Sequence, residues 1–360
     1  MPEFINGLML CEQFFNEIAR PVLDKHYPVL RYSAGLIGYG SDVLGYDDVT
    51  STDHMWGPRF YLFLSDIDIL LKDEIVDAFG YEFPYSYKGY SVNFSAPDLK
   101  DNGVRHAEMI SSGKVSPLIF IHTIDEYLSW YLGTADLDNL TDLDWLSFSE
   151  HRLLALTSGK IFYDGLHIKE KLDILRFYPE NVKLYLLASN WSLIAEEQAY
   201  VKRCFDVGDD IGSVLVCARI ADRLMRLLFL CCNTYAPYSK WFGTAFARLP
   251  VDEKIKNCIS SALAARDITE REDNIVMAQK LVAYLHIEQH IIDFVDIKIQ
   301  SYFGRNIKVI YADKITDAIM QKLEGTEFEN YPLIGSLSQV ANFTNIFDKP
   351  ERRDNIKKLY

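Results

Sequence analysis

The sequence predicts an α+β fold in which a small mixed sheet is followed by a mostly helical bundle. In the first third of the chain, short runs of β-branched and aromatic residues alternate with turns and helical patterns. Beyond about residue 181, apolar residues repeat at helical spacing instead. The 360 residues, 49% of them hydrophobic, are enough for two cores. We therefore expect one domain at residues 1–178 and a helical domain with an irregular C-terminal tail at 179–360.

Four segments of the first domain are expected to form β-strands. VLRYSAGLIGYG (29–40) contains a strand that ends in glycine, and RFYLFL (59–64) is the second strand. GYSVNF (89–94) is the third, and GKIFYDG (159–165) is the fourth. Helical patterns lie between these segments, so helices and strands should share one core.

The second domain contains three long apolar patterns typical of buried helices, at residues 181–205, 211–232 and 271–295. The second pattern is the most apolar run of the chain. Four charged residues interrupt it, which a membrane-spanning helix rarely tolerates: Arg219, Asp222, Arg223 and Arg226. We expect a buried helix of the bundle.

The composition of the chain limits the classes of partner it can bind and the cellular compartment expected for it. A formal net charge of −14 argues against general nucleic-acid binding, because it provides no overall positive field. The six cysteines form no C-x-x-C pair and lie mainly on apolar stretches, as reduced thiols do. The N-terminal segment has no cationic leader ahead of an apolar block. We therefore expect a cytoplasmic protein without a membrane partner.

The segment GYGSDVLGYDDVTSTDHMWGPR (38–59) carries the main functional hypothesis. Glycine at position 40 allows close backbone approach after a strand, and a helix opening at Ser41 would present unpaired N–H groups to a phosphate. Asp53, at the start of the next strand, would then hold Mg²⁺ against the phosphates. On spacing alone, an ordinary loop with Asp47, Asp48 and Ser51 as turn and cap residues is slightly favoured.

Three motifs resemble a known family: GSDVLGYDDVTSTDHMWGPR (40–59), NWSLIAEEQAYVKRCFDVGDDIGSVLVCARIADRLMRL (190–227) and YAPYSKWFGTAFARL (235–249). They are similar to the bacterial domain-of-unknown-function family 4037, which is grouped with the nucleotidyltransferase superfamily that includes antibiotic adenylyltransferases. The resemblance implies a small nucleotidyltransferase-like mixed sheet with a helical partner domain. It also implies transfer of a nucleoside monophosphate from a nucleoside triphosphate to an acceptor.

The resemblance assigns roles to residues of the first motif, and it also reveals departures. Gly40 and Ser41 match the pair that seats the phosphates, and Asp53 matches the first metal carboxylate. The second carboxylate of the pattern falls two residues later, where this chain has Met55. The third would lie within GYSVNF, where the chain has Asn93, whose amide supplies neither a negative charge nor a general base.

Other residues near the motif offer partial replacements. Asp47 and Asp48 are alternative metal ligands, and we take Asp48 as the partner of Asp53. His54 is a candidate ligand or catalytic proton carrier, although a histidine in such a place is more often a structural hydrogen-bonding residue. Arg59 either contacts phosphate or closes a turn by binding an aspartate of the 47–53 loop.

Farther along the chain, Lys240 lies in the aromatic segment YAPYSKWFGTAF. It either reaches a triphosphate from the helical domain or is a solvated lysine at an aromatic packing corner. Arg219, Arg223 and Arg226 share one side of a helix, where they contact phosphate or, more often, pair with acids such as Asp222.

Two further patterns have structural explanations. LSDIDIL (64–70) places Ser65 three residues before Asp68, which is the spacing of a helix N-terminal capping box. His286 and His290 have the i, i+4 spacing of two metal ligands on one helix. No third ligand is evident near them in the sequence, so an exposed or half-buried helix face is the expected role.

Three functional hypotheses follow. The first is a Mg²⁺-dependent nucleotidyltransferase that uses a nucleoside triphosphate and an unidentified hydroxyl acceptor on a small molecule or a protein. The second is a non-catalytic nucleotide-binding or regulatory module, in which Met55 and Asn93 mark lost metal ligands. The third is a scaffold that keeps the fold without a nucleotide. Gly40, Ser41 and Asp53 argue against the third.

Overall fold

The fold is described from a computed structural model that covers residues 3–52, 55–101, 103–341, 343–344 and 349–360. The structure is α+β and 54% helical, with a small mixed sheet in the N-terminal part and a mostly helical C-terminal region, so the predicted fold class is confirmed. The chain divides into two compact units. The first combines Met1–Leu140 with Arg152–Arg176, and the second combines Thr141–His151 with Phe177–Tyr360. The domain limits of 1–178 and 179–360 stay a prediction, since compactness alone does not define independently folding domains.

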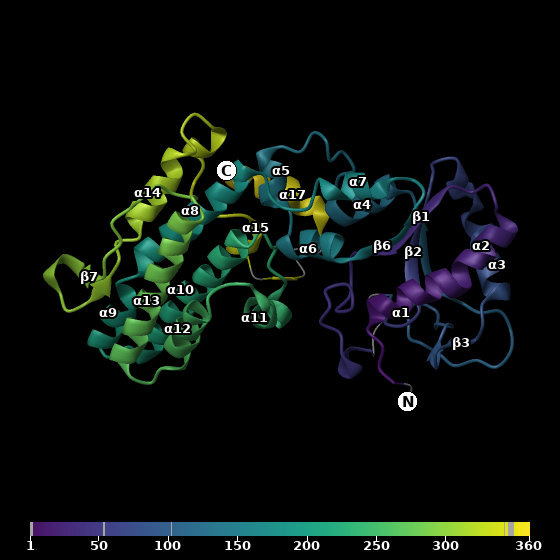
Figure 1. Cartoon of the computed structure of the whole chain (residues 1–360), viewed down its shortest axis with the longest axis horizontal. Coiled ribbons are helices and arrows are strands. Elements are labelled where there is room, and N and C mark those ends of the chain that lie inside the picture. The colour runs from purple at the N-terminus through teal and green to yellow at the C-terminus, as the bar shows by residue number, and fades with distance from the viewer. Residues whose placement is uncertain (1–2, 53–54, 102, 342, 345–348) are drawn as a thin grey trace. The chain divides into compact units, whose positions relative to one another are not determined.

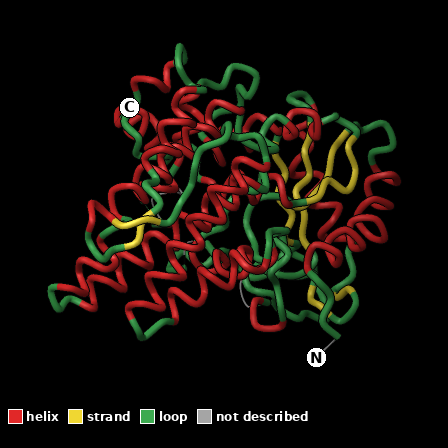
Figure 2. Tube along the Cα trace, turned by 60° about the vertical axis from the view of Figure 1, so that its left-hand side comes forward, coloured by secondary structure: helices red, strands yellow, loops and turns green. Residues whose placement is uncertain are grey.

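A four-stranded sheet with the order β5-β2-β1-β6 forms the centre of the first unit (Figures 1 and 2). β1 is antiparallel to β2 and β6, whereas β2 and β5 are parallel, so the sheet is mixed. All residues of β1 and β2 are buried, because both faces of the sheet are covered. The strands are β1 (Tyr32–Leu36), β2 (Arg59–Leu64), β5 (Leu118–His122) and β6 (Lys160–Asp164).

Helices cover the two faces of this sheet. On one face, Phe60 packs against Phe14 and Phe15 from the helices that begin the chain. On the other face, Tyr61 packs against Tyr127. The helical elements of this unit are α1 (Gly7–Phe14), the π-helix η1 (Phe15–Ala19), α2 (Arg20–His26), η2 (Val49–Ser51), η3 (Asp68–Leu71), α3 (Lys72–Glu82), α4 (Ile124–Leu132), most of α6 (Glu150–Ser158) and α7 (Ile168–Asp173).

All four predicted segments contain a strand, but only three of these strands belong to the central sheet. GYSVNF contributes only β4 (Tyr90–Ser91), which pairs with β3 (Ser86–Tyr87) in a separate hairpin (Figure 2). The Ser91 hydroxyl donates to backbone carbonyls, and such local bonds compete with strand pairing. β5 takes the edge position beside β2, and the sequence reasoning missed it.

The predicted capping box in LSDIDIL is confirmed only for its N-cap bond, because no reciprocal bond from the Ser65 N–H to the Asp68 side chain is found among the described residues. The Asp68 N–H donates to the Ser65 hydroxyl at 3.1 Å, and that hydroxyl donates to the Asp68 carboxylate at 2.6 Å. The 3₁₀ helix η3 and then α3 continue from this point. These aspartates therefore begin a helix and do not form a strand motif.

The second unit is a helical bundle in which α10 packs against α8, α9, α12 and α13, while α14 packs on α8 (Figure 1). Its helical elements are α5 (Asp142–Ser147), α8 (Glu180–Glu197), α9 (Tyr200–Asp206), α10 (Asp210–Cys231), α11 (Ser239–Arg248), α12 (Glu253–Ala264), α13 (Ile268–Glu288), η4 (Tyr302–Gly304), α14 (Asp313–Gln321), η5 (Glu327–Asn330), α15 (Leu337–Val340), η6 (Pro350–Arg352), α17 (Arg353–Ile356) and η7 (Lys357–Leu359). A small hairpin joins β7 (Gln300–Ser301) to β8 (Lys308–Val309).

The most apolar run of the sequence forms α10, as predicted. One side of this helix is buried along its length, and residues 224–231 near its C-terminal end, Arg226 included, are all buried. No helix among the described residues is long and apolar enough to cross a membrane.

Candidate functional site

A tight turn follows β1 and brings the predicted phosphate-seating residues to the edge of the sheet. We call residues 38–45 the Gly40 turn. Its backbone closes through hydrogen bonds from Tyr46 to Ser41 at 2.8 Å and from Gly45 to Asp42 at 3.2 Å. The expectation that Ser41 opens a helix was wrong, because the chain reverses at Gly45, whose φ is +69°.

An ion pair between Asp42 and Arg59 holds this turn against β2. Both Arg59 terminal nitrogens donate to the Asp42 carboxylate, and Nη2 also donates to the Tyr39 carbonyl at 3.0 Å. The side chains of Arg59 and Asp42 are only 6% and 1% exposed. Burial opposes the charge of Arg59, but the Asp42 carboxylate outweighs it and raises the pKa of the guanidinium. Of the two predicted roles of Arg59, closing a turn agrees better with this contact, although its partner is Asp42 and not an aspartate of the 47–53 loop.

Gly40 is required by this pair. Its φ is +129°, a region that side chains disfavour, and a Cβ there would lie 2.0 Å from Asp42 Oδ1 and 2.6 Å from Arg59 Nη2. Gly45 in the same turn also has a positive φ, but a Cβ there would meet no atom within 4 Å. Of these two glycines, only Gly40 is at a position where a side chain would compete directly with the ion pair.

A cavity of about 280 Å³ lies beside the turn. Within the described part of the chain, the backbone N–H groups of three successive residues that line it donate to no acceptor. Successive unpaired N–H groups in a turn form an anion-binding surface. These residues are Gly40, Ser41 and Asp42.

Aromatic side chains form much of the remaining wall of this cavity. Tyr61 stacks on Phe120 with ring centroids 4.9 Å apart, and Trp56 and Tyr39 also line the space. The lining is mostly apolar, which suits a planar ring system. A turn with three successive unpaired N–H groups thus adjoins an aromatic cavity.

Asp47 already has protein partners for its carboxylate. One oxygen accepts from the Gly7 N–H at 2.7 Å and from Trp56 Nε1 at 3.1 Å, while the other accepts from the side chain of Asn6. Gly7 begins α1, where the helix dipole also favours a negative charge. Asp47 thus connects α1 to the loop and has a structural role.

Asp48 caps the short helix η2. Its Oδ1 accepts from the Thr50 and Ser51 N–H groups. In return, the Asp48 N–H donates to the Ser51 hydroxyl, which completes a capping box. Hydrogen bonds from the Thr50 hydroxyl and N–H lower the pKa of Asp48. The explanation of these residues as turn and cap residues is therefore confirmed for Asp48 and Ser51.

The structure describes only some of the residues proposed for metal binding. Asp53 and His54 lie outside the described residues. Met55 lies in a bend with φ +46° before β2, not within a strand. Asn93 is buried away from a strand, where its Oδ1 accepts from the Ser116 N–H at 2.8 Å.

The described residues alone do not supply a Mg²⁺ site, which requires several oxygen ligands in octahedral geometry. The oxygens of Asp42 and Asp47 are engaged by N–H donors, and Met55 offers only a thioether. No group of three or more His, Cys, Asp or Glu residues in the described ranges could hold a metal ion. The described residues around the Gly40 turn thus suit an anion better than a cation.

Lys240 belongs to the second unit, whereas the residues of the motif at 40–59 belong to the first. Its ammonium lies 4.8 Å from the centre of the Trp241 ring, and its side chain is exposed. This arrangement matches the aromatic packing corner expected as one of its two roles.

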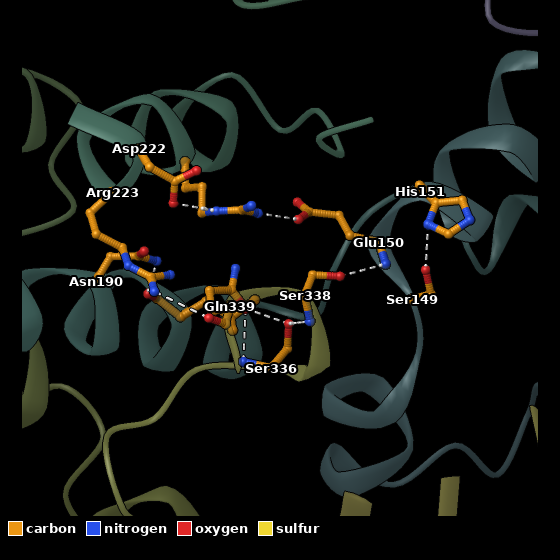
Figure 3. Close-up of polar contacts among 11 residues, drawn as sticks. Ser149, Glu150, His151, Asn190, Asp222, Arg223, Ser336, Ser338 and Gln339 are labelled. Atoms are coloured by element: carbon orange, nitrogen blue, oxygen red, sulfur yellow. Dashed lines mark hydrogen bonds and ion pairs between the residues drawn. The ribbon is translucent and has the colours of Figure 1, made fainter. Parts of the chain in front are cut away.

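The second unit contains its own buried charges, shown in Figure 3. We call Glu150, Asp222 and Arg226 the Glu150 cluster. Arg226 Nε donates to Asp222 at 3.0 Å, and Nη1 reaches Glu150 at 3.5 Å. The Glu150 N–H donates to the Ser338 hydroxyl at 3.0 Å. Burial raises the pKa of the Glu150 carboxyl, although Arg226 opposes the shift.

The cluster was only partly predictable. Pairing of Arg226 with Asp222 follows from their i, i+4 spacing. Arg219 pairs instead with Glu197, and Arg223 donates to the Gln339 carbonyl at 3.1 Å. The sequence reasoning missed Glu150, because its partner is 76 positions away in the chain.

His286 is fully buried, so it does not lie on the exposed or half-buried helix face that was expected. His286 Nε2 accepts from Trp191 Nε1 at 3.0 Å, and burial lowers the pKa of His286 to about 3. His290 lies beyond the end of α13 with φ +58°, so the two rings do not share a helix face.

Comparison with known proteins gives one family match. The model of a family described as "Domain of unknown function (DUF4037)" matches residues 145–242. This range contains the motif at 190–227 and the beginning of the motif at 235–249, whereas the motif at 40–59 precedes it. No curated protein matches the chain.

Proposed function

Because residues 145–242 of this chain belong to the DUF4037 family, whose description assigns no activity, we propose a function from the geometry of the first unit: it binds a nucleotide beside the Gly40 turn. The phosphates occupy the anion-binding backbone of the turn, and the base occupies the aromatic cavity. The unit serves as a binding or regulatory module and does not transfer a nucleotidyl group.

The observation that carries this proposal is the set of three successive unpaired N–H groups at Gly40, Ser41 and Asp42. Such groups bind phosphate through directed hydrogen bonds without requiring a cationic side chain. Asp42 would repel an anion if its charge were uncompensated. The two hydrogen bonds from Arg59 neutralise it, so the turn presents N–H donors beside a neutral pair.

The cavity favours a nucleotide over inorganic phosphate. Its volume of about 280 Å³ exceeds what a phosphate fills, and the walls include the stacked pair Tyr61 and Phe120. Stacking on aromatic rings is tolerant of base identity, because every base has a π-face. We therefore expect modest discrimination between purine and pyrimidine nucleotides.

The engagement of the nearby carboxylates by protein donors favours nucleotide binding without nucleotidyl transfer. Metal-dependent nucleotidyl transfer needs carboxylates that are free to coordinate ions, and those of Asp42 and Asp47 are held by protein donors. Met55 and Asn93 stand where the resemblance expects the remaining acids. These substitutions support the non-catalytic module over the transferase.

Calorimetric titration with non-hydrolysable nucleoside triphosphate analogues, with and without Mg²⁺, tests the proposal. We expect binding without Mg²⁺ that falls at least tenfold in Gly40→Ala, because the new Cβ displaces the Asp42–Arg59 pair. Gly45→Ala is the matched control, since it changes a positive-φ glycine of the same turn without a clash. It should retain binding.

The same titration distinguishes the alternative. Asp48 Oδ2 accepts no hydrogen bond within the described part of the chain, so this oxygen is available to a cation. Binding that requires Mg²⁺ and weakens in Asp48→Asn would contradict our proposal. It would favour the Mg²⁺-dependent nucleotidyltransferase, with Asp53 and Asp48 as metal ligands, His54 as a catalytic residue and a hydroxyl acceptor.

A further inference from the structure

A cavity of about 340 Å³ lies within the second unit, between α8, α10 and the segment 333–340. We propose that it binds a small carboxylic acid that carries an N–H or O–H donor beside the carboxylate and an apolar body. The proposal is independent of nucleotide binding in the first unit. It depends on Asn190, Arg223 and the apolar residues that line the space.

Asn190 supplies an acceptor that the protein leaves unused. The residue is 1% exposed, and its Nδ2 donates to the Leu186 carbonyl at 2.7 Å, which fixes the orientation of the amide. Its Oδ1 is buried and has no hydrogen-bond partner among the described residues. An unpaired buried carbonyl oxygen is unfavourable, because it has lost its hydrogen bond to water without gaining another. A ligand donor at this position would supply the missing hydrogen bond.

Arg223 supplies the charge that complements a carboxylate. Its Nη2 donates to the Gln339 carbonyl at 3.1 Å, which is the only hydrogen bond of its guanidinium within the described ranges. Figure 3 shows Arg223 and Asn190 extending from their helices toward the segment that carries Gln339. A guanidinium with unused N–H groups matches the planar geometry of a carboxylate.

Neither group alone defines the ligand, but together they do. A simple anion would satisfy Arg223 and leave Asn190 Oδ1 unpaired. A cationic amine would satisfy Asn190 and be repelled by Arg223. A carboxylate with an adjacent N–H or O–H satisfies both groups.

The rest of the cavity wall sets the body of the ligand. Leu333, Ile334 and Val340 line the space, so an aliphatic side chain would bury apolar area there. Glu196 also lines the cavity but is exposed, and water screens its charge. An N-acylated aliphatic amino acid has all the required features.

Calorimetry with three matched probes tests this assignment on the intact chain. N-acetyl-leucine carries the carboxylate, the N–H and the apolar body. N-acetyl-leucinamide lacks the carboxylate, and 4-methylpentanoate lacks the N–H. We expect N-acetyl-leucine to bind at least tenfold more tightly than either of the other two.

Variants then locate the binding. Arg223→Gln and Asn190→Leu should each weaken binding of N-acetyl-leucine at least tenfold. Glu196→Gln, which alters an exposed lining residue, should retain or modestly strengthen it. Asn190→Leu should also preserve the melting temperature, because it removes an oxygen that the protein leaves unpaired.

Three results would overturn the proposal. They are no binding of N-acetyl-leucine at millimolar concentration, equal binding of all three probes, and binding that is unaffected by both variants. The probe series does not depend on any variant folding, so the proposal stays testable if a substitution disrupts the bundle. Failure here leaves nucleotide binding by the first unit unaffected, because that experiment uses other ligands and other variants.

Discussion

Each unit buries an arginine with carboxylates, but the two arrangements balance charge differently. In the first unit, one acid meets one base: Arg59 makes two hydrogen bonds to Asp42, and both side chains are almost fully buried. In the second unit, two acids share Arg226, and the contact with Glu150 is at the 3.5 Å limit of a hydrogen bond. The first arrangement is a compensated pair, and the second carries a surplus carboxylate.

This difference shows that buried charge has two distinct consequences. A compensated pair fixes geometry, since removing either partner leaves the other charge buried without a counter-charge. A surplus carboxylate shifts its pKa instead, because protonation relieves the cost of burial. The Asp42–Arg59 pair should therefore contribute more to stability, whereas the Glu150 cluster should make part of the stability depend on pH.

The largest expected effect is that of Asp42→Asn. The substitution leaves Arg59 buried without a counter-charge, and loss of one partner of a buried pair costs about 3–5 kcal/mol. Urea denaturation followed by circular dichroism would measure the loss in the free energy of unfolding. Nucleotide binding should fall as well, because the Gly40 turn loses its link to β2.

Asp222→Asn is the control in the other unit. Asp222 pairs with Arg226 across one helical turn, and its side chain is 29% exposed. Partly exposed i, i+4 pairs contribute about 0.3–0.5 kcal/mol. If this variant were as destabilised as Asp42→Asn, the distinction between the two arrangements would be wrong.

Gly40→Ala should have the next largest effect. The strained backbone at φ +129° costs about 1–3 kcal/mol for a residue with a side chain, in addition to the clash with Asp42. Gly45→Ala should lose less, since only its backbone conformation is unfavourable. Thermal melts of the two variants measure this difference. Equal losses in melting temperature would show that the ion pair is not the reason why position 40 requires glycine.

The sequence predicted elements whose signals are local. β1, β2 and β6 follow from runs of apolar residues bounded by turns, and the N-cap bond of Ser65 follows from a three-residue spacing. β5 was not predicted, because a short apolar run is equally compatible with a strand or a core segment. Its identity depends on pairing with β2.

The candidate site was less predictable, because side chains distant in sequence define it. Gly40, Ser41 and Arg59 do lie around one cavity. The role of Asp42 was missed, although it belongs to the motif, since its partner is 17 positions away. A helix was expected at Ser41, but Gly45 reverses the chain after a single turn. Long-range pairing of this kind leaves no periodic pattern in a sequence.

Acid should destabilise the second unit through His286. Its Nε2 accepts from an indole N–H, which can only donate, so the buried ring is neutral. The pKa is about 3 in the folded chain against 6.5 ordinarily, so unfolding takes up a proton between these values. The free energy of unfolding should fall by about 1.4 kcal/mol per pH unit as the pH drops through this window.

His286→Gln tests this assignment, because glutamine can still accept from Trp191 but does not titrate. Urea denaturation at several pH values between 3 and 6.5 should show a shallower slope in the variant than in the wild type. Identical slopes would indicate that groups other than His286 determine acid sensitivity.

The smallest effect is expected for Glu150→Gln. Glu150 should lower the free energy of unfolding as the pH rises, whereas His286 lowers it as the pH falls. The raised pKa of Glu150 means that the folded chain holds a proton that the unfolded chain has already released. Wild-type stability should therefore be fully present below the ordinary carboxyl pKa and decline as the pH rises through the raised one. Glutamine remains neutral and can still accept from Arg226, so the variant should lack this decline and differ by about 1 kcal/mol or less near neutral pH. Denaturation curves of both proteins across the acidic to neutral range measure the difference, and a variant that loses stability with rising pH as steeply as the wild type would show that Glu150 carries no surplus charge.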